Sequence, residues 1–302
     1  MNGILVVDKP RGASSHDVVQ WGRRAFGTRS VGHAGTLDPM ATGVLLLLVG
    51  EATKLSAFLT LADKRYVAEV ALGAETDSLD ADGVVVTELP VPGSISIDSV
   101  RAALGPMLGS VEQQAPAVSA IKVQGRALHE RVRRGEDVSA PVREVVLHSA
   151  DVLCVEERRI ELSIHCGKGY YVRSLARDLS RALGTVGHLS ALRRTSSGPF
   201  VVDKAFPGER LRAIRSDAER AELRAKLVGL VDACEGMARA RLTEAGAMHA
   251  RHGRPVPFTD TGLECSPGPV EPVAMLSPSG QLLAIGKADA TGCLRVVRGF
   301  VG

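Results

Sequence analysis

A glycine-rich loop that runs directly into a long apolar segment is the strongest constraint on how this chain folds. Residues 32–43 hold three glycines and one acid, Asp38, and residues 44–49 are all Val or Leu. That apolar run is too short to span a bilayer and predicts a buried strand or a turn of core helix. Glycine permits positive φ, and Pro39 favours extended geometry at Asp38. The segment is typical of a tight turn before a core strand, or of a carboxylate held as a nucleophile or base.

Bulk composition is that of a globular protein larger than one average domain. The 302 residues are 45% hydrophobic and 24% charged, which are ordinary values. Five scattered cysteines without a C-x-x-C pair argue against a disulfide framework and favour a reducing compartment. The first ten residues lack a signal-peptide pattern. We therefore expect a cytoplasmic protein.

Hydrophobic patterning predicts strands interspersed with helices over most of the chain. After about residue 236 the sequence is rich in Gly and Pro and predicts only short strands. We predict one large domain over residues 1–235 and a small β-rich domain over residues 236–302. The expected strands are 4–7, 66–72, 84–86, 145–155, 159–166, 273–276, 282–287 and 294–297, and the expected helices are a segment capped by Ser14 or Ser15, 97–108, 172–183 and 218–230.

Positive charge gathers in two short segments although the formal net charge is only +3. Residues 122–134 and 168–194 hold five and six basic residues, each against a single acid. Most charge runs are solvated surface, but two of them on a nearly neutral chain indicate a surface for a phosphate backbone. The predicted nucleic-acid contacts are Lys122, Arg126, Arg133, Arg177, Arg181, Arg193 and Arg194.

The sequence contains no motif for cofactor or metal chemistry. The histidines show no ligand spacing with a second His, Cys or acid, and there is no phosphate loop, dinucleotide fingerprint or G-x-S-x-G elbow. We therefore expect no metal, no nucleotide and no other cofactor. A glycoside hydrolase with paired carboxylates stays open, because Asp38 has Asp8, Asp77 and Asp80 as candidate partners.

Five short motifs, taken in order, resemble those of the bacterial tRNA pseudouridine synthase B family. They lie at residues 3–17, 32–54, 63–66, 168–173 and 192–194. Each motif alone is unspecific, but their order over most of residues 1–200 is specific. The resemblance implies isomerisation of a uridine in the T-loop of tRNA, at position 55, with the base flipped out of its stack. It also implies an α/β fold of the α+β type: a mixed, largely antiparallel sheet with flanking helices, followed by a small PUA-like β-barrel.

The same resemblance assigns roles to six residues. Asp38 matches the catalytic aspartate, and Arg173 matches the arginine that pairs with it. Tyr66 matches a tyrosine that stacks on the flipped base, and Tyr171 one that assists proton removal from C5. The remaining matches are a histidine that fills space near the extruded nucleotide and an apolar pocket wall: His33 and Leu192.

An RNA-clasping segment is expected at about residues 112–140, and here the chain departs from the family. Ala115 or Ala117 stands where the family usually has Pro, and Val118 and His129 stand where it usually has aromatic residues. The implied partner is the T-arm of tRNA, with no membrane and with a monomeric enzyme. One rival is an RNA-binding or tRNA-folding factor with incidental or lost isomerase activity. The sequence also leaves open whether Asp38 attacks the ribose C1′ or the uracil ring.

Overall fold

A large mixed sheet forms the body of the protein. The computed structural model describes residues 1–117, 122–123, 126–127, 141–263, 268 and 271–300. Within these residues the sheet has ten strands in the order β14-β1-β3-β12-β4-β11-β10-β7, with β2 beside β3 and β13 beside β12. Its neighbours are antiparallel except for the β1–β14 and β3–β12 pairs, which are parallel. The strands are β1 (Gly3–Lys9), β2 (Val31–Ala34), β3 (Thr42–Val49), β4 (Lys64–Leu72), β7 (Gly109–Gln114), β10 (Val142–Glu156), β11 (Arg159–Cys166), β12 (Gly187–Ser197), β13 (Phe200–Val201) and β14 (Phe206–Pro207).

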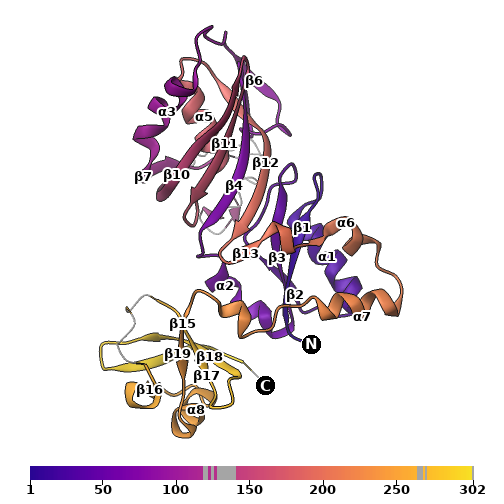
Figure 1. The fold of residues 1–302 in the computed structure, drawn as a ribbon, viewed down its shortest axis with the longest axis vertical. Helices are drawn as coiled ribbons and strands as arrows, with labels where there is room; N and C mark the ends of the chain where they lie inside the picture. Colours follow the sequence, from indigo (N-terminus) through magenta and orange to yellow (C-terminus); the bar gives the residue numbers. More distant parts are fainter. Residues whose placement is uncertain (118–121, 124–125, 128–140, 264–267, 269–270, 301–302) are drawn as a thin grey trace.

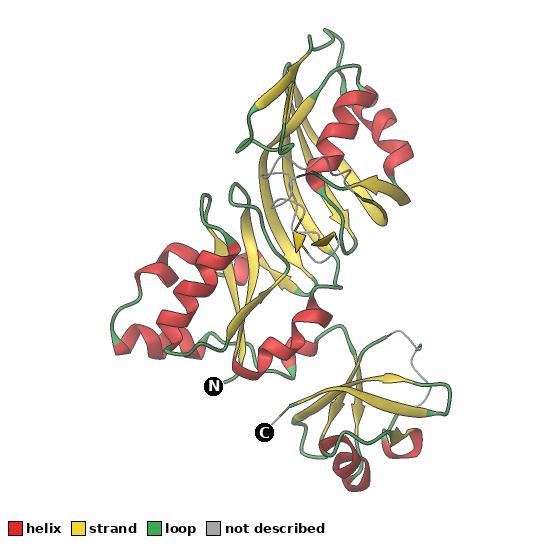
Figure 2. Ribbon diagram, turned by 180° about the vertical axis from the view of Figure 1, so that it is seen from behind, coloured by secondary structure: helices red, strands yellow, loops and turns green. Residues whose placement is uncertain are grey.

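Helices flank this sheet in two groups. The helices, in chain order, are α1 (Ser15–Phe26), α2 (Ser56–Leu59), α3 (Ile97–Leu104), α5 (Val172–Ala182), α6 (Gly208–Ala213) and α7 (Asp217–Ala225). Helices α3 and α5 pack on its β7–β10–β11–β4 half (Figure 1). Helices α1, α6 and α7 gather beside the β1–β3 half. Figure 2 shows the first pair from the other side, lying against the long strands. No described helix is long and apolar enough to cross a membrane.

The C-terminal part forms a separate five-stranded sheet in the order β15-β17-β18-β19-β16. Three of the strands were predicted, and the predictions at 273–276, 282–287 and 294–297 are confirmed by β17, β18 and β19. The helix α8 (Glu244–Arg251) was not predicted. Its mixture of Ala, Gly and His lacks a clear apolar period. This curled sheet fits the expected PUA-like barrel, and its strands are β15 (Ala238–Arg241), β16 (Val256–Pro257), β17 (Val273–Leu276), β18 (Leu282–Ala288) and β19 (Cys293–Gly299).

The remaining short strands form two hairpins apart from the two sheets. β5 (Ala74–Thr76) pairs with β6 (Val85–Glu88), which confirms the strand predicted at 84–86 with a shift of one or two residues. β8 (Lys122–Val123) pairs with β9 (Arg126–Ala127) inside the expected RNA-clasping segment.

The apolar run after the glycine loop is a central strand, which decides between the buried strand and the turn of core helix that the sequence left open. β3 lies between β1 and β12, and every residue from Val44 to Val49 is at most 1% exposed. A strand covered on both faces reads as a continuous apolar run rather than an alternating one. The Asp38 loop is therefore attached to a fully buried strand inside the sheet.

Two predicted helices end earlier than their patterns indicated. α3 stops at Leu104 and is followed by a 3₁₀ turn over Gly105–Met107. Pro106 prevents regular continuation, because proline has no N–H to donate. The polar helix expected over 218–230 is α7, which ends at Ala225. Beyond it, Val228 pairs with Ile4 as an isolated bridge, so tertiary pairing replaces the last helical turn.

Candidate active site

The Asp38 loop joins β2 to β3 and is fastened to the opening segment of the chain. Ser15 begins α1, and its hydroxyl oxygen lies 2.9 Å from the Leu37 nitrogen and 3.1 Å from the Leu37 carbonyl oxygen. The Gly12 N–H donates to the Pro39 carbonyl at 2.8 Å. Ser14 caps α1 in a capping box with Asp17, which fixes the helix start that presents Ser15. The first and second sequence motifs therefore form one substructure.

A buried lysine holds the same loop from inside. Lys9 is fully buried, and its Nζ donates to the carbonyls of Ala13 at 2.6 Å, Pro10 at 3.0 Å and Pro39 at 3.2 Å. Burial lowers the pKa of Lys9 to about 8, against the opposing effect of Asp38. Three carbonyl acceptors match the three donors of an ammonium group. Sequence analysis missed this residue, whose only signal was its place before Pro10 in the opening motif.

Arg173 joins two carboxylates across the site. Its Nη2 donates to Asp38 Oδ1 at 3.3 Å, and its Nε lies 3.0 Å from Asp38 Oδ2. Its Nη1 donates to the Ser78 carbonyl at 2.8 Å and lies 3.4 Å from Asp80 Oδ2. Two-point contact fixes a carboxylate in orientation as well as position. The partner expected for Asp38 is therefore beside it.

Asp80 is a site residue whose role the sequence did not reveal. Its side chain is 7% exposed, and its Oδ1 accepts from the Ser78 hydroxyl at 2.7 Å and from the Asp82 N–H at 3.1 Å. The preceding Leu79 has φ 63°, a strained value for a branched side chain. The segment is pinned to β12 through Leu189. Asp80 was considered only as a second acid for glycoside hydrolysis, whereas here its carboxylate is an acceptor that holds Arg173.

The electrostatics of Asp38 combine two opposing effects. Burial raises the pKa of the carboxyl above its usual 3.8, and the Arg173 guanidinium lowers it, while Asp80 adds a smaller upward effect. About a third of the side chain, 34%, stays exposed. A carboxylate that is partly desolvated and held by an arginine is oriented and only weakly hydrated, as a nucleophile requires.

A cavity of about 480 Å³ opens above this pair. That volume lies in the range of small-molecule sites. Five of the six residues matched to the family's active site line it. They are Asp38, Tyr66, Tyr171, Arg173 and Leu192. His33, the sixth, is on β2 and does not line the cavity; its carbonyl accepts from the Ser56 hydroxyl at 3.1 Å.

All three tyrosines of the chain line the cavity, Tyr170 without having been predicted, and the two predicted ones reach it from different elements. Tyr66 comes from β4 and is 9% exposed, and burial raises the pKa of its hydroxyl. Tyr171 is the residue before α5, and its backbone N–H and carbonyl both bond the Gln113 side chain of β7, at 2.9 and 3.1 Å. Leu192, on β12, adds an apolar wall. The cavity thus presents aromatic and apolar surface next to one carboxylate.

Two cationic side chains in the cavity wall were also not predicted. Lys64, at the start of β4, donates its Nζ to the Thr60 and Ala62 carbonyls. Burial lowers its pKa to about 8. Arg143, on β10, is exposed at the cavity wall. It lies between the two predicted basic segments, so counting charge in windows did not find it.

Arg194 does not fit its predicted place on the nucleic-acid surface. The side chain is 1% exposed, with Nε donating to the Val44 carbonyl at 2.6 Å and Nη2 to the Gly35 carbonyl at 2.9 Å. Its Nη1 donates to the Thr36 carbonyl at 3.4 Å. Arg194 is an internal brace of the Asp38 loop, because guanidinium donors satisfy carbonyls that the loop leaves without strand partners. Arg177 is similarly buried, with its Nε 2.7 Å from Asp178 Oδ1.

The other predicted basic contacts differ in accessibility. Arg181 is 56% exposed and pairs with Glu75, and Arg193 is 44% exposed and pairs with Asp8. Arg133 lies outside the described residues. Lys122 and Arg126 lie on β8 and β9, whose side chains are likewise outside the description. Val118 and His129, two of the departures from the family pattern, are also outside it.

Known proteins resemble this chain over nearly its whole length. Residues 23–172 match the TruB family pseudouridylate synthase (N terminal domain), and residues 173–234 match the tRNA pseudouridylate synthase B C-terminal domain. The chain is 39% identical to tRNA pseudouridine synthase B of Arthrobacter sp. (strain FB24), over 99% of this chain and 97% of the relative. It is 41% identical to the protein of that name from Aromatoleum aromaticum, over 97% and 91%. The chain belongs to the TruB family.

The fold agrees as well. A solved chain from a Cbf5-Nop10-Gar1 complex superposes with a TM-score of 0.77 at 24% identity, covering 99% of this chain and 85% of that one. A second, from an archaeal box H/ACA Nop10-Cbf5 complex, gives 0.73 at 23% identity, with 99% and 86% covered. At such identities the likeness concerns the fold, and it spans both sheets of this TruB-family chain.

Proposed function

We propose that the protein is a tRNA pseudouridine synthase that isomerises the T-loop uridine at position 55, with Asp38 as its nucleophile. The observation that carries this proposal is the contact between Asp38 and Arg173 at the wall of a cavity that Tyr66, Tyr171 and Leu192 also line. The TruB-family match and the relatives named tRNA pseudouridine synthase B give the reaction class.

The reaction breaks the bond between N1 and C1′ and forms one between C5 and C1′. The C5 hydrogen leaves as a proton and N1 gains a proton, so the composition of the nucleotide is unchanged. Such a step needs a nucleophile to hold one fragment covalently and a pocket that retains the base while it turns. Asp38 supplies the carboxylate, and the cavity supplies the space.

The roles of the other residues follow from their positions. Arg173 keeps Asp38 ionised and aimed, and Asp80 keeps Arg173 in place from its far side. Tyr66 offers an aromatic face for the flipped base, Tyr171 is placed to assist removal of the C5 proton, and Leu192 excludes water. A base reaches this cavity only after leaving its stack, which costs a few kcal/mol.

We infer further that the substrate element is the T-arm, and that the enzyme acts as a monomer in the cytoplasm. The T-arm follows from the family resemblance of the ordered motifs. Light scattering on the free enzyme and on its tRNA complex gives the stoichiometry; a dimeric mass in both would refute the monomer.

The first prediction concerns Asp38→Asn. An unmodified tRNA transcript with tritium at uracil C5 should release label with wild-type protein, and release should fall to background with the variant, because an amide is not a nucleophile of this kind. Asp98→Asn is the matched control, since Asp98 is 93% exposed on α3; it should release label at the wild-type rate.

The same assay separates the synthase from the two alternatives, an RNA-binding or tRNA-folding factor and a glycoside hydrolase. Equal release by wild type and Asp38→Asn, or none by either, would contradict the synthase. A transcript with cytidine at position 55 tests the site: label release unchanged from the uridine transcript would contradict T-loop specificity while leaving the synthase activity intact.

A further inference from the structure

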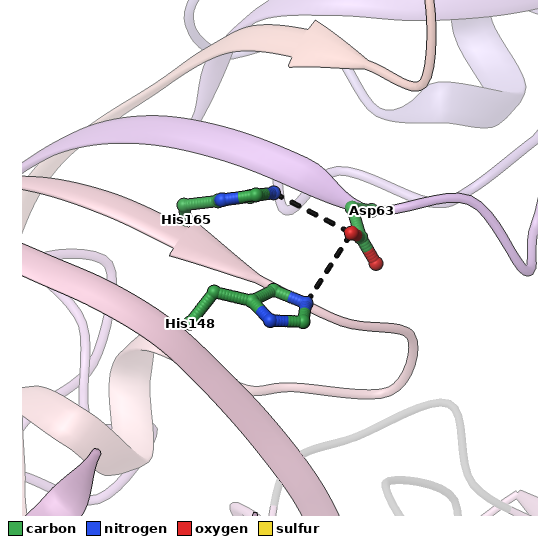
Figure 3. A group of neighbouring side chains, drawn as sticks. All are labelled: Asp63, His148 and His165. Carbon is green, nitrogen blue, oxygen red and sulfur yellow. Dashed lines mark ion pairs between the residues drawn. The ribbon is translucent and has the colours of Figure 1, made fainter. Parts of the chain in front are cut away.

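Three chemically related side chains converge on one point outside the Asp38 cavity. Asp63 precedes β4, His148 is on β10 and His165 is on β11, three strands that are neighbours in the sheet (Figure 3). His148 Nε2 lies 3.2 Å from Asp63 Oδ2, and His165 Nε2 lies 3.4 Å from the same oxygen. One Asp and two His are far apart in sequence, which is why ligand spacing along the chain gave no sign of them.

The backbone is shaped to bring the two imidazoles together. Leu147 pairs with Cys166 and Ser149 pairs with His165, so the register slips by one residue at His148. Such a bulge places two residues opposite one and re-aims a side chain. The two rings consequently lie with their centroids 4.6 Å apart and tilted by 39°. Asp63 is fixed from its own side, where its carbonyl accepts the Gly198 N–H at 2.8 Å.

The spacing suits a common ligand to all three groups. Zinc binds imidazole nitrogen at about 2.0–2.1 Å and carboxylate oxygen at about 2.0–2.2 Å, which puts tetrahedral ligand atoms about 3.3 Å apart. The two Asp–His distances bracket that value, and all three ligand atoms lie within 4.8 Å of one another. A simple ion pair needs only one histidine, whereas here both rings point their Nε2 at one oxygen (Figure 3).

The group is also open to solvent. Asp63, His148 and His165 have side chains 49%, 38% and 24% exposed. Asp63 and His165 line a second cavity of about 730 Å³ that reaches Met237 and Pro272 of the small sheet. Three protein ligands with room for a fourth, small ligand is the arrangement of metal sites that keep an open position.

We propose that Asp63, His148 and His165 form a binding site for one divalent transition-metal ion of the Zn²⁺ class, with three protein ligands and an open fourth position. Among the described residues this is the group with the composition and spacing of such a site. The site is separate from Asp38, and uridine isomerisation makes no use of it.

Cobalt(II) tests the proposal, because a four-coordinate Co²⁺ site absorbs strongly in the visible range and octahedral Co²⁺ in water does not. The full chain, free of any purification tag, is titrated with Co²⁺ at neutral pH, and Zn²⁺ is then added in competition. We expect one Co²⁺ per chain, with a visible spectrum that Zn²⁺ abolishes.

Three variants locate the ion: His148→Ala, His165→Ala and Asp63→Asn. Each should weaken binding by at least the ~10–100-fold that loss of a metal site's supporting residue costs. His252→Ala is the matched control, since His252 is an exposed histidine directly after helix α8; its titration should match wild type. Circular dichroism checks that each variant is folded. No four-coordinate spectrum with wild type, or one that persists in folded His148→Ala and His165→Ala, would overturn the proposal.

Discussion

At the scale of single residues, the site holds a carboxylate in surroundings that disfavour its charge. Burial raises the pKa of Asp38, and Arg173 opposes that effect. When the folded-state pKa of an acid lies above its unfolded value, the group's contribution to stability is fully present below the unfolded pKa. It is lost as pH rises through the folded pKa. Ionisation of Asp38 therefore lowers the free energy of unfolding at neutral pH, although the proposed reaction needs the carboxylate.

We therefore expect Asp38→Asn to be slightly more stable than wild type at neutral pH. The gain should be below about 1 kcal/mol, because a third of the side chain faces solvent, which corresponds to ~1–3 °C in Tm. It should shrink as pH falls towards 3.8, the ordinary value, where the wild-type carboxyl is also neutral. Thermal unfolding from about pH 4 to about pH 8 measures this. A gain that grows towards acid pH would contradict the sign argued here.

A second residue-scale prediction concerns Arg194. Lysine cannot supply the fork of donors that binds the carbonyls of Gly35, Thr36 and Val44. Arg194→Lys should lower the free energy of unfolding by about 2 kcal/mol or more, since a buried acceptor without a partner costs ~1–3 kcal/mol. Urea unfolding measures the loss.

The matched control is Arg193→Lys at the neighbouring, exposed position. It should be close to wild type in stability. Lysine keeps the charge, so Arg194→Ala tests the salt dependence of tRNA affinity, and its salt slope should equal that of wild type. A lower slope in Arg194→Ala, with Arg194→Lys as stable as wild type, would restore the phosphate contact first expected for Arg194.

At the scale of secondary-structure elements, the sequence pattern predicted the strands whose burial depends on their own residues. The apolar run 44–49 forms β3 and the alternating segment 66–72 forms β4, because the residues of a strand determine which of its faces can be buried. The contacts between Arg173 and Asp80 and between His148 and His165 depend on which strands are neighbours. Nothing in residues 145–155 indicates a bulge at His148. The place of Asp38 in the site was predicted from ordered motifs, whereas the inward turn of Arg194 was not, because a charge count does not show which way a side chain points.

A prediction at this scale concerns Gly43, where β3 meets β12. Gly43 has φ +98°, and a Cβ there would lie 2.1 Å from the Arg194 carbonyl oxygen. Gly43→Ala should cost ~2–5 kcal/mol of unfolding free energy, because backbone strain of ~1–2 kcal/mol adds to displacement of a packed strand, ~1–3 kcal/mol. Chemical denaturation measures it.

Gly27→Ala is the matched control in the same sheet domain. Gly27 caps α1 at φ +67°, and no atom lies within 4 Å of the point where an alanine Cβ would stand. It should lose only the ~1–2 kcal/mol of backbone strain. Similar losses at the two glycines would show that β12 moves away from the added methyl group at Gly43 with no loss of unfolding free energy.

At the scale of the whole molecule, one apolar cluster joins the two sheets. Phe58 and Leu55, which follow β3, pack with Ile285 and Phe300 of the small sheet. Lys54 adds a hydrogen bond from its Nζ to the Gly299 carbonyl at 3.0 Å. The small sheet therefore packs against the chain segment that connects the Asp38 loop to Asp63. This interface supports the backbone between the two candidate sites.

Charge at this scale decides how the protein holds RNA, and Arg181 tests it. With Arg177 and Arg194 buried, Arg181 is the most exposed arginine of the second basic segment. Each phosphate contact contributes about 0.7–0.9 to the slope of log affinity against log salt. Arg181→Ala should lower the slope for tRNA by about that amount and weaken binding at low salt. Filter binding over a salt series measures both.

Two controls separate a phosphate contact from a general loss of charge. Arg212→Ala removes an exposed arginine that also has an acidic neighbour, on α6 beside the other half of the sheet; its slope should equal that of wild type. Arg177→Ala should leave the slope unchanged and lower the stability, because the Arg177 guanidinium donates hydrogen bonds to Asp178 and to the Gln114 carbonyl. If Arg177→Ala lowers the slope as much as Arg181→Ala, helix α5 must turn its buried arginine outward when RNA binds, and the free structure understates the basic surface.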